Sequence, residues 1–190
     1  MLSAFKLARL FLVSAGIAST VGCGDDLGLD DWSAIPDTVT IFSLSRSDLI
    51  NLPSAYDFVN HSALRVESPV AAGRWDLAVL HEGSGLALVT AGGFPGQNSR
   101  AAIAAITGTT FDELAEAPED TTRYTVGPVV VQPGQVFAVR TRRAECSFSL
   151  SVRYGKMRVL DVDPAAGSVR FVAITNPFCN DRELIPPNED

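Results

Sequence analysis

The chain has 190 residues, of which 46% are hydrophobic, and its formal net charge is -7 at pH 7. This acidity disfavours a nucleic-acid partner, because proteins bind nucleic acids mainly through basic contacts to phosphate. The length and the hydrophobic content are sufficient for one domain with a single core.

The first 22 residues have the composition of an export signal. Lys6 and Arg9 form a short basic start, and an uncharged, mostly apolar run follows at residues 10–21. This run is shorter than the roughly 20 apolar residues of a transmembrane helix, so we expect the segment to be cleaved off rather than to anchor the protein. Its removal takes away two basic residues and changes the formal net charge from -7 to -9, which disfavours adsorption to anionic lipid.

Small residues lead from the apolar run into Cys23, in the order STVGC at residues 19–23. This stretch resembles the lipobox of bacterial lipoproteins, in which the peptide is cut before the cysteine and acyl chains are attached to that cysteine. The resemblance implies a protein that acyl chains on Cys23 hold on the bacterial cell envelope, at the outer membrane or the cell surface rather than the inner membrane. The alternative is an ordinary cleavage site with a chance cysteine.

An acidic segment follows the cysteine at residues 24–36, GDDLGLDDWSAIP. Its four aspartates, two glycines and terminal proline leave too little apolar surface for it to fold alone. We therefore interpret residues 23–36 as the lipidated cysteine with an acidic linker, and residues 37–190 as a single domain.

Short runs with β propensity fill the first half of that domain. They are separated by Pro, Asn, His or Gly and lie at residues 38–44, 54–60, 63–68, 74–80 and 86–91. An exposed loop is expected at residues 92–100. Thr110 and Glu113 form a capping box that predicts one short helix near residues 111–117, followed by Pro118.

The second half predicts longer strands. Residues 125–131 and 135–141 flank Gln-Pro-Gly and predict a hairpin. Residues 146–153, CSFSLSVR, alternate apolar residues with serine and predict a half-buried strand. Residues 156–162 and 168–174 flank DPAAG and predict a second hairpin. Together these runs predict an all-β fold, an antiparallel sandwich or barrel of short strands and hairpins.

Lipidation of Cys23 would leave two cysteines, Cys146 and Cys179. Cys146 shares the parity of the apolar residues in its run, so its side chain is expected to point inward. An oxidising compartment favours a disulfide between the two, and in the chain-entropy model the loop that they close is worth about 3–4 kcal/mol. The alternative is a pair of buried free thiols.

A further resemblance rests on the order of the segments. The signal and acidic linker are followed by AYDFVNHSALRVES at residues 55–68, by GRWDLAVL at residues 73–80 and by closing hairpins. This order resembles the HmuY-type haem-binding surface lipoproteins, in which a Trp-Asp-hydrophobic-Ala strand recurs; residues 75–78 match it. The chain also resembles uncharacterised lipoproteins of environmental bacteria, a likeness that implies no activity.

The resemblance to the HmuY-type proteins implies haem as a possible cofactor, held by axial His or Met side chains on loops beyond the Trp-Asp strand. His81 lies just past that strand and is the candidate ligand. His61 precedes the strand, and Met157 alternates with Val159 and is expected in the core. For both histidines the alternative is a solvated loop residue.

The sequence contains no recognisable enzymatic motif, and we predict that the protein is not an enzyme. The Gly-Ser-Gly at residues 83–85 lacks the full G-x-S-x-G spacing and predicts a turn. The metal-binding spacings H-E-x-x-H and C-x-x-C are absent. Asp161 and Asp163 would need three or more further oxygen ligands to hold Ca²⁺, so a solvated hairpin end is expected.

Three arginines close to Cys146 allow two interpretations. Arg140, Arg142 and Arg143 could bind an anionic ligand, or they could form a solvated face paired with Glu145.

The sequence as a whole is compatible with two functions. The first is a tethered binding module that captures a small ligand or an envelope protein. The alternative is a structural or accessory lipoprotein of an envelope complex, with no small-molecule site.

Overall fold

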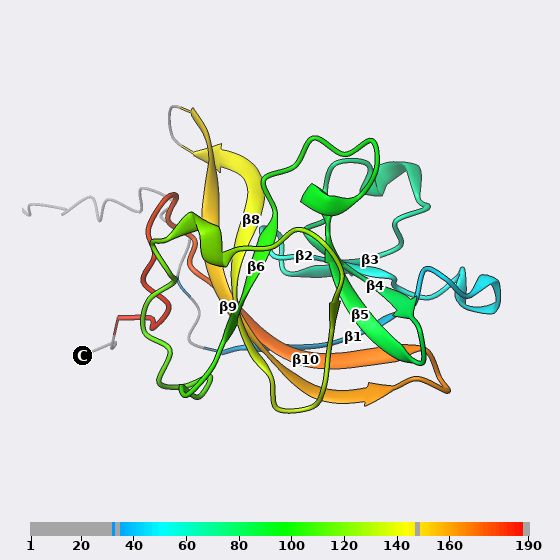
Figure 1. The fold of residues 1–190 in the computed structure, drawn as a ribbon. Coiled ribbons are helices and arrows are strands. Elements are labelled where there is room, and N and C mark those ends of the chain that lie inside the picture. The colour runs from blue at the N-terminus through cyan, green and yellow to red at the C-terminus, as the bar shows by residue number, and fades with distance from the viewer. Residues whose placement is uncertain (1–31, 33–34, 147–148, 188–190) are drawn as a thin grey trace, which may run out of the picture.

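The computed structural model describes residue 32, residues 35–146 and residues 149–187. The expected signal at residues 1–22, Cys23 and most of the expected linker lie outside the described residues. Figure 1 shows that the described chain is built from strands joined by loops and short 3-10 turns. The fold is all-β, as predicted.

The strands and the 3-10 turns follow the chain in the order β1 (Asp37–Phe42), η1 (Ser47–Leu49), β2 (Ala55–Asp57), β3 (Ser62–Leu64), η2 (Pro69–Ala71), β4 (Leu77–Glu82), β5 (Gly85–Thr90), η3 (Ala91–Gly93), β6 (Ala102–Ile106), η4 (Thr121–Arg123), β7 (Val129–Val130), β8 (Val136–Cys146), β9 (Ser149–Asp163) and β10 (Ser168–Thr175).

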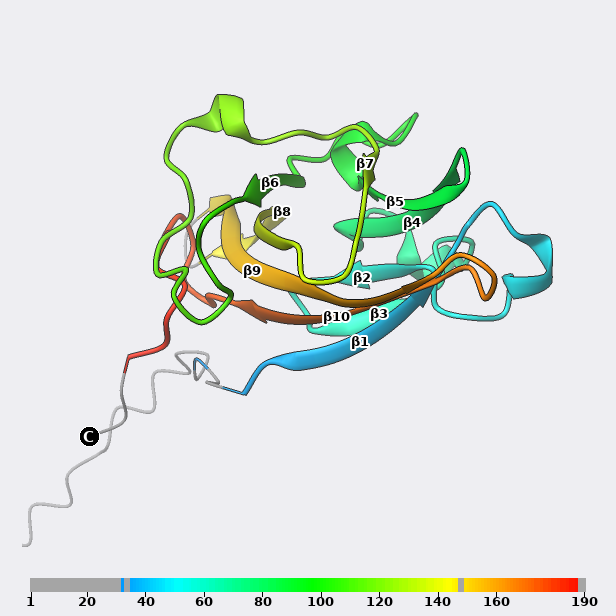
Figure 2. The ribbon, with the colours of Figure 1, turned by 60° about the horizontal axis from the view of Figure 1, so that its bottom comes forward.

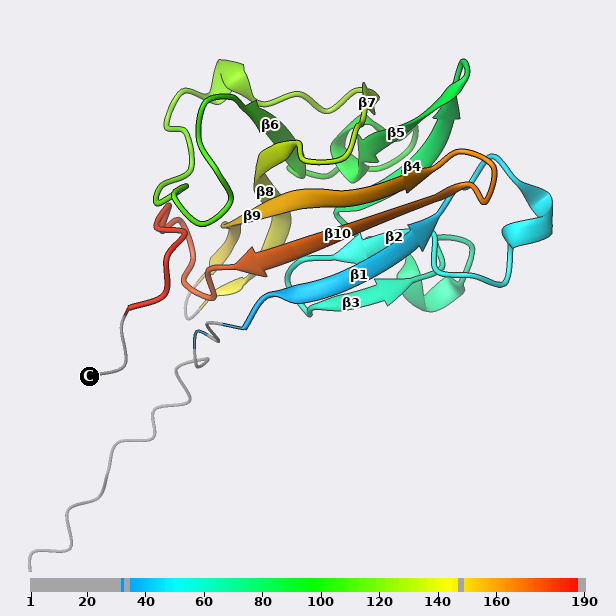
Figure 3. The ribbon, with the colours of Figure 1, turned by 90° about the horizontal axis from the view of Figure 1, so that it is seen from below.

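Two antiparallel sheets pack as a sandwich. The first sheet has the strand order β1-β10-β9-β8-β6, and the second has the order β3-β2-β4-β5-β7. Strands β9, β10 and β1 run side by side in Figure 3, and Figure 2 shows β4 and β5 in the other layer. A parallel bridge between Ser43 and Val79 connects the end of β1 to β4, so the two sheets meet along this side.

Apolar side chains from both sheets fill the space between the layers. In β10 the alternating residues Val169, Phe171 and Ala173 are buried, as expected for a strand with one face on the core. The Tyr56 ring lies edge-on to Phe171, with 5.5 Å between the ring centroids. Met157 is fully buried in the same cluster, which confirms its predicted place in the core.

The predicted hairpin at residues 156–162 and 168–174 is confirmed by β9 and β10, whose ends pair Asp163 with Ser168. The predicted hairpin at residues 125–131 and 135–141 is wrong. Strand β7 pairs with β5 in the second sheet, whereas β8 pairs with β6 and β9 in the first. The Pro-Gly turn therefore carries the chain from one sheet to the other, a long-range choice that the local turn signal does not encode.

The predicted single strand at residues 146–153 is also wrong, because the chain reverses within it. Strand β8 ends at Cys146, β9 begins at Ser149, and these two residues pair with each other. Residues 147–148 lie outside the described residues. Leu150 was expected inside but is 61% exposed; it pairs with Glu145 near the tip of the hairpin.

The predicted helix at residues 111–117 is wrong, because the chain forms only a turn at residues 111–113. The Thr110 backbone N–H donates to Glu113 and the Glu113 N–H donates to Thr110 Oγ1, so the capping box does form. Beyond it, the Leu114 carbonyl accepts a hydrogen bond from Lys156 Nζ at 2.9 Å, and Ala117 N–H donates to the Arg182 carbonyl at 2.8 Å. The Ala117 N–H is thereby diverted from the Glu113 carbonyl, its partner in a second helical turn, and Pro118 has no N–H to donate to the Leu114 carbonyl.

Candidate functional site

A β-bulge in β8 creates the site. Arg140 pairs with Tyr154 and Arg143 pairs with Val152, so two residues of β8 lie opposite the single residue Arg153. The Arg153 backbone N–H donates to Thr141 Oγ1 at 2.9 Å instead of to a ladder carbonyl. Bulges change the direction of side chains, and this one directs the residue between Thr141 and Arg143 toward the second sheet.

That residue is Arg142, whose guanidinium lies between two buried carboxylates. Its Nη1 donates to Asp57 Oδ1 at 2.6 Å and to Asp76 Oδ2 at 3.0 Å, and its Nη2 donates to Asp57 Oδ2 at 3.1 Å. The Asp57 and Asp76 side chains are 0% and 1% exposed, and that of Arg142 is 12% exposed. We call these three residues the ionic cluster. It joins β8 of the first sheet to β2 of the second sheet and to the residue that precedes β4.

The two carboxylates also order the backbone around them. Asp76 accepts the Phe58 N–H at 2.9 Å and the Arg142 N–H at 2.5 Å. Asp57 accepts the N–H groups of Val59 and Asn60 at 3.0 and 3.1 Å. Burial raises the pKa of Asp76 to about 6, although Arg142 opposes this rise. The ionic cluster therefore fixes the loop that follows β2.

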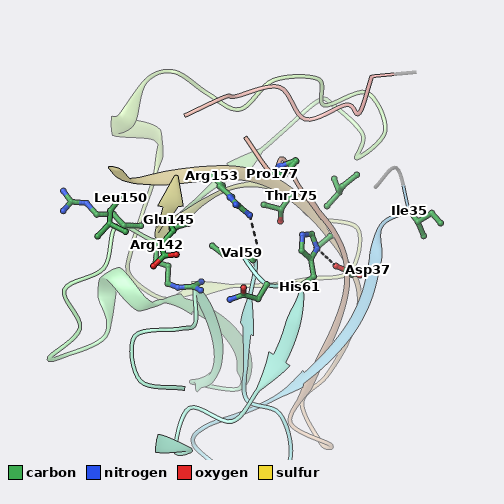
Figure 4. Close-up of a pocket in the computed structure, with 15 residues that line it drawn as sticks. Ile35, Asp37, Val59, His61, Arg142, Glu145, Leu150, Arg153, Thr175 and Pro177 are labelled. Carbon is green, nitrogen blue, oxygen red and sulfur yellow. Dashed lines mark hydrogen bonds and ion pairs between the residues drawn. The ribbon is translucent and has the colours of Figure 1, made fainter. Parts of the chain in front are cut away.

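A pocket of about 920 Å³ opens beside the ionic cluster, and Figure 4 shows its lining residues. We call it the main pocket. Four segments form its walls: residues 35–37 at the start of β1, residues 59–61 after β2, the β8–β9 hairpin and residues 173–177 at the end of β10. Strands of the first sheet and the loop between β2 and β3 of the second thus form one concave surface.

The lining of the main pocket mixes apolar and polar residues and carries charges of both signs. His61 Nδ1 lies 2.8 Å from Asp37 Oδ2, and the Tyr56 hydroxyl donates to the same oxygen at 2.7 Å. Burial raises the pKa of Tyr56 above its usual value. In Figure 4, the Asp37–His61 pair lies on one wall and Arg153 extends across the pocket toward Val59.

Cys146 and Cys179 lie at disulfide distance, as predicted, with their Cα atoms 6.2 Å apart. The pair connects the β8–β9 hairpin, which supplies Glu145 and Leu150 to the main pocket, to the C-terminal segment, which supplies Pro177. In Figure 1 this segment runs beside the hairpin. The disulfide therefore holds two walls of the main pocket together.

His81, the predicted haem ligand, lies on β4 rather than on the loop after it. Its Nδ1 is 2.9 Å from Ser43 Oγ, and its Nε2 is 3.4 Å from the Pro164 carbonyl. His81 thus lies at Ser43, just past the end of β1, whereas His61 contacts Asp37 at the start of β1. Because a strand rises about 3.3 Å per residue, the two histidines are about 20 Å apart. Met157 is buried in the core. The described residues thus do not bring two axial ligands to one pocket, and they do not fit a haem held in that way.

The remaining motifs have local roles. Gly83 and Ser84 form the turn of the β4–β5 hairpin, as predicted. Asp163 Oδ1 accepts the Ala166 N–H at 2.8 Å within the β9–β10 turn, as a hairpin end requires. No group of three or more His, Cys, Asp or Glu side chains in the described part of the chain is arranged to hold a metal ion.

The ionic cluster was not predicted as a unit. Arg142 was expected to face solvent or a ligand, and Asp76 was singled out only as part of a family motif. The burial pattern of β8 marks the bulge. Every second residue is buried at Phe137, Val139 and Thr141, but the next buried residue is Ala144, three positions later. Such a shift in the alternation indicates a bulge.

Within the described ranges, no helix is long and apolar enough to cross a membrane. Comparison of the chain with protein-family models and with curated proteins gives no match.

Proposed function

We propose that this chain is a bacterial lipoprotein, held on the cell envelope by acyl chains on Cys23, whose β-sandwich captures a small polar ligand in the main pocket. The observation that carries the binding role is the pocket itself, about 920 Å³ in volume. Pockets of about 300–1,000 Å³ are typical of small-molecule sites.

The construction of the main pocket supports a binding role. Its walls come from four separate segments, and each is fixed by an interaction that does not depend on a ligand. The ionic cluster holds residues 58–60, and the disulfide holds the hairpin against the C-terminal segment. A preformed site loses less conformational entropy when a ligand binds, which favours affinity.

The lining indicates the chemistry of the ligand. Asp37 and Glu145 supply negative charge, Arg143 supplies positive charge, and Asn60 and His61 add further hydrogen-bonding groups. Burying these groups under an apolar ligand would remove their hydration without replacement. A hydrophilic ligand that forms hydrogen bonds is therefore favoured over a lipid.

The experiment is a thermal-shift panel on the full chain extracted in detergent from membranes of a bacterial host. The probes are amino acids, short peptides, mono- and oligosaccharides, nucleotides and haem. A ligand at about 100 times its dissociation constant adds about 2.7 kcal/mol of stability, which raises Tm by roughly 5–10 °C in a domain of this size.

Two variants locate the binding. Glu145→Trp places a large side chain in the main pocket and should abolish the shift, whereas Glu82→Trp makes the same change at the exposed β4–β5 turn and should leave it intact. If no class of probe raises Tm, or if Glu145→Trp keeps the full shift, the binding role is wrong. A chain that binds none of these probes would instead fit the accessory role in an envelope complex.

A further inference from the structure

A second pocket, of about 280 Å³, borders the main pocket at Arg142 and Arg143, which line both. We call it the small pocket. Its other walls include Trp75, which is only 1% exposed, and the loop of residues 97–100. The bulge in β8 thus presents one arginine to the ionic cluster and the next to the boundary between two pockets.

The charge of the small pocket is of one sign. Three arginines line it, and none of its lining residues is acidic, although the whole chain has a formal net charge of -7. Asp57 and Asp76 neutralise Arg142. Arg100 and Arg143 are exposed and form no ion pair within the described part of the chain. Among the described residues, two guanidinium groups at one concave surface therefore have no carboxylate paired with them.

The backbone that carries Arg100 is held in place. Its carbonyl accepts a hydrogen bond from Arg140 Nε at 3.0 Å, and the Arg140 guanidinium lies 5.2 Å from the centroid of the Tyr124 ring. The Ala101 N–H donates to Ser99 Oγ at 3.1 Å, which orders the preceding residue of the loop. The position of Arg100 at the rim is thus set by the fold.

The neighbouring side chains suit an oxyanion with hydroxyl groups attached. A guanidinium presents parallel N–H donors that match the oxygens of a carboxylate or phosphate. Gln97 and Asn98 also line the small pocket, and their amides can donate to an oxyanion or exchange hydrogen bonds with hydroxyl groups.

We propose that the small pocket binds an oxyanion (a carboxylate, sulfate or phosphate ester) through Arg100 and Arg143, and that the ligand of the main pocket carries this group past Arg143. The link to the ligand of the main pocket rests on the proposed function. The oxyanion site itself concerns the small pocket alone and is tested without the natural ligand.

The test titrates the full chain in detergent with inorganic phosphate, sulfate, glucuronate and neutral glucose by calorimetry. Chloride is adjusted to keep the ionic strength constant, so that screening does not change. We expect saturable binding of the anions and none of glucose. Preference for glucuronate over the inorganic ions would identify an anionic sugar as the source of the oxyanion.

The variants are Arg100→Gln and Arg143→Gln, singly and combined, with Arg123→Gln as the control. Arg123 is exposed and lines neither pocket. Its replacement removes one positive charge, as each single variant does. Hydrogen bonds to charged groups are strong enough that the combined variant should lose about tenfold or more in affinity, while Arg123→Gln binds as the unaltered chain does.

Absence of saturable anion binding, equal binding of glucose and glucuronate, or unchanged affinity in the combined variant would each overturn the oxyanion site. The two proposals fail separately. Saturable phosphate binding with no ligand for the main pocket refutes only the proposed function. If a ligand is found for the main pocket and the combined variant binds it with unchanged affinity, only the proposed contact of that ligand with Arg100 and Arg143 is refuted.

Discussion

Arg142→Met tests whether the ionic cluster holds the two sheets together. The substitution keeps most of the side-chain stem but removes three hydrogen bonds to Asp57 and Asp76. The two carboxylates are 0% and 1% exposed, so they would remain buried without a positive charge. Breaking a buried ion pair in this way costs about 3–5 kcal/mol.

The expected consequence is a fall in Tm on the order of 10 °C for a domain of this size, measured by circular dichroism. Arg182→Met is a matched control, because Arg182 also lies between two carboxylates, those of Glu116 and Glu119, which are 59% and 87% exposed. Exposed pairs of this kind contribute about 0.2–1 kcal/mol. A loss for Arg142→Met no greater than that for Arg182→Met would refute the structural role of the ionic cluster.

Three further predictions concern pH, the disulfide and the anchor. Burial raises the pKa of Asp76 to about 6, so the folded chain binds the proton on this carboxyl more tightly than the unfolded chain does. The contribution of Asp76 to the free energy of unfolding is therefore greatest at acid pH and is lost as pH rises through about 6. Urea unfolding at pH 4.5 and 7.5 should show this difference in the unaltered chain and not in Asp76→Asn. Reduction of the Cys146–Cys179 pair, 33 residues apart, should lower the free energy of unfolding by about 3–4 kcal/mol, and an unchanged melting curve in reductant would contradict this. Cys23→Ser should move the protein from the membrane fraction to the soluble fraction or stall its processing; normal maturation with membrane retention would show that Cys23 is not the anchor.

The strands were predictable where a local pattern coincides with burial. In β10 the period-2 alternation is clear, and the adjoining Pro164 and Gly167 mark the turn. Strand β6 was missed because three of its five residues, Ala102–Ile106, are alanines, which have low β propensity. A strand of this kind forms because its neighbours bury it, and that information is not local.

Pairing across the sandwich was the larger source of error. The turn at Pro133 and Gly134 was located correctly. However, the strand before it pairs with β5 in the second sheet, through Val129 and Leu88, and not with β8 of the first sheet, which follows the turn. The same limit applies to the site. Asp57 and Arg142 are 85 residues apart in sequence, and alternation can show that a residue faces inward but not which distant charge it meets.

The position of the main pocket relative to the linker restricts how it can work. Ile35 and Asp37 line it, so it lies at the end of the domain where the linker joins. If Cys23 is acylated as proposed, residues 24–36 can extend no further than about 45 Å, at about 3.5 Å per residue. The mouth of the pocket is then confined to a layer of that depth above the lipid head groups. On the proposed function, the acyl anchor would limit the distance from the membrane at which a ligand is captured, while the affinity would depend on the walls that the ionic cluster and the disulfide hold.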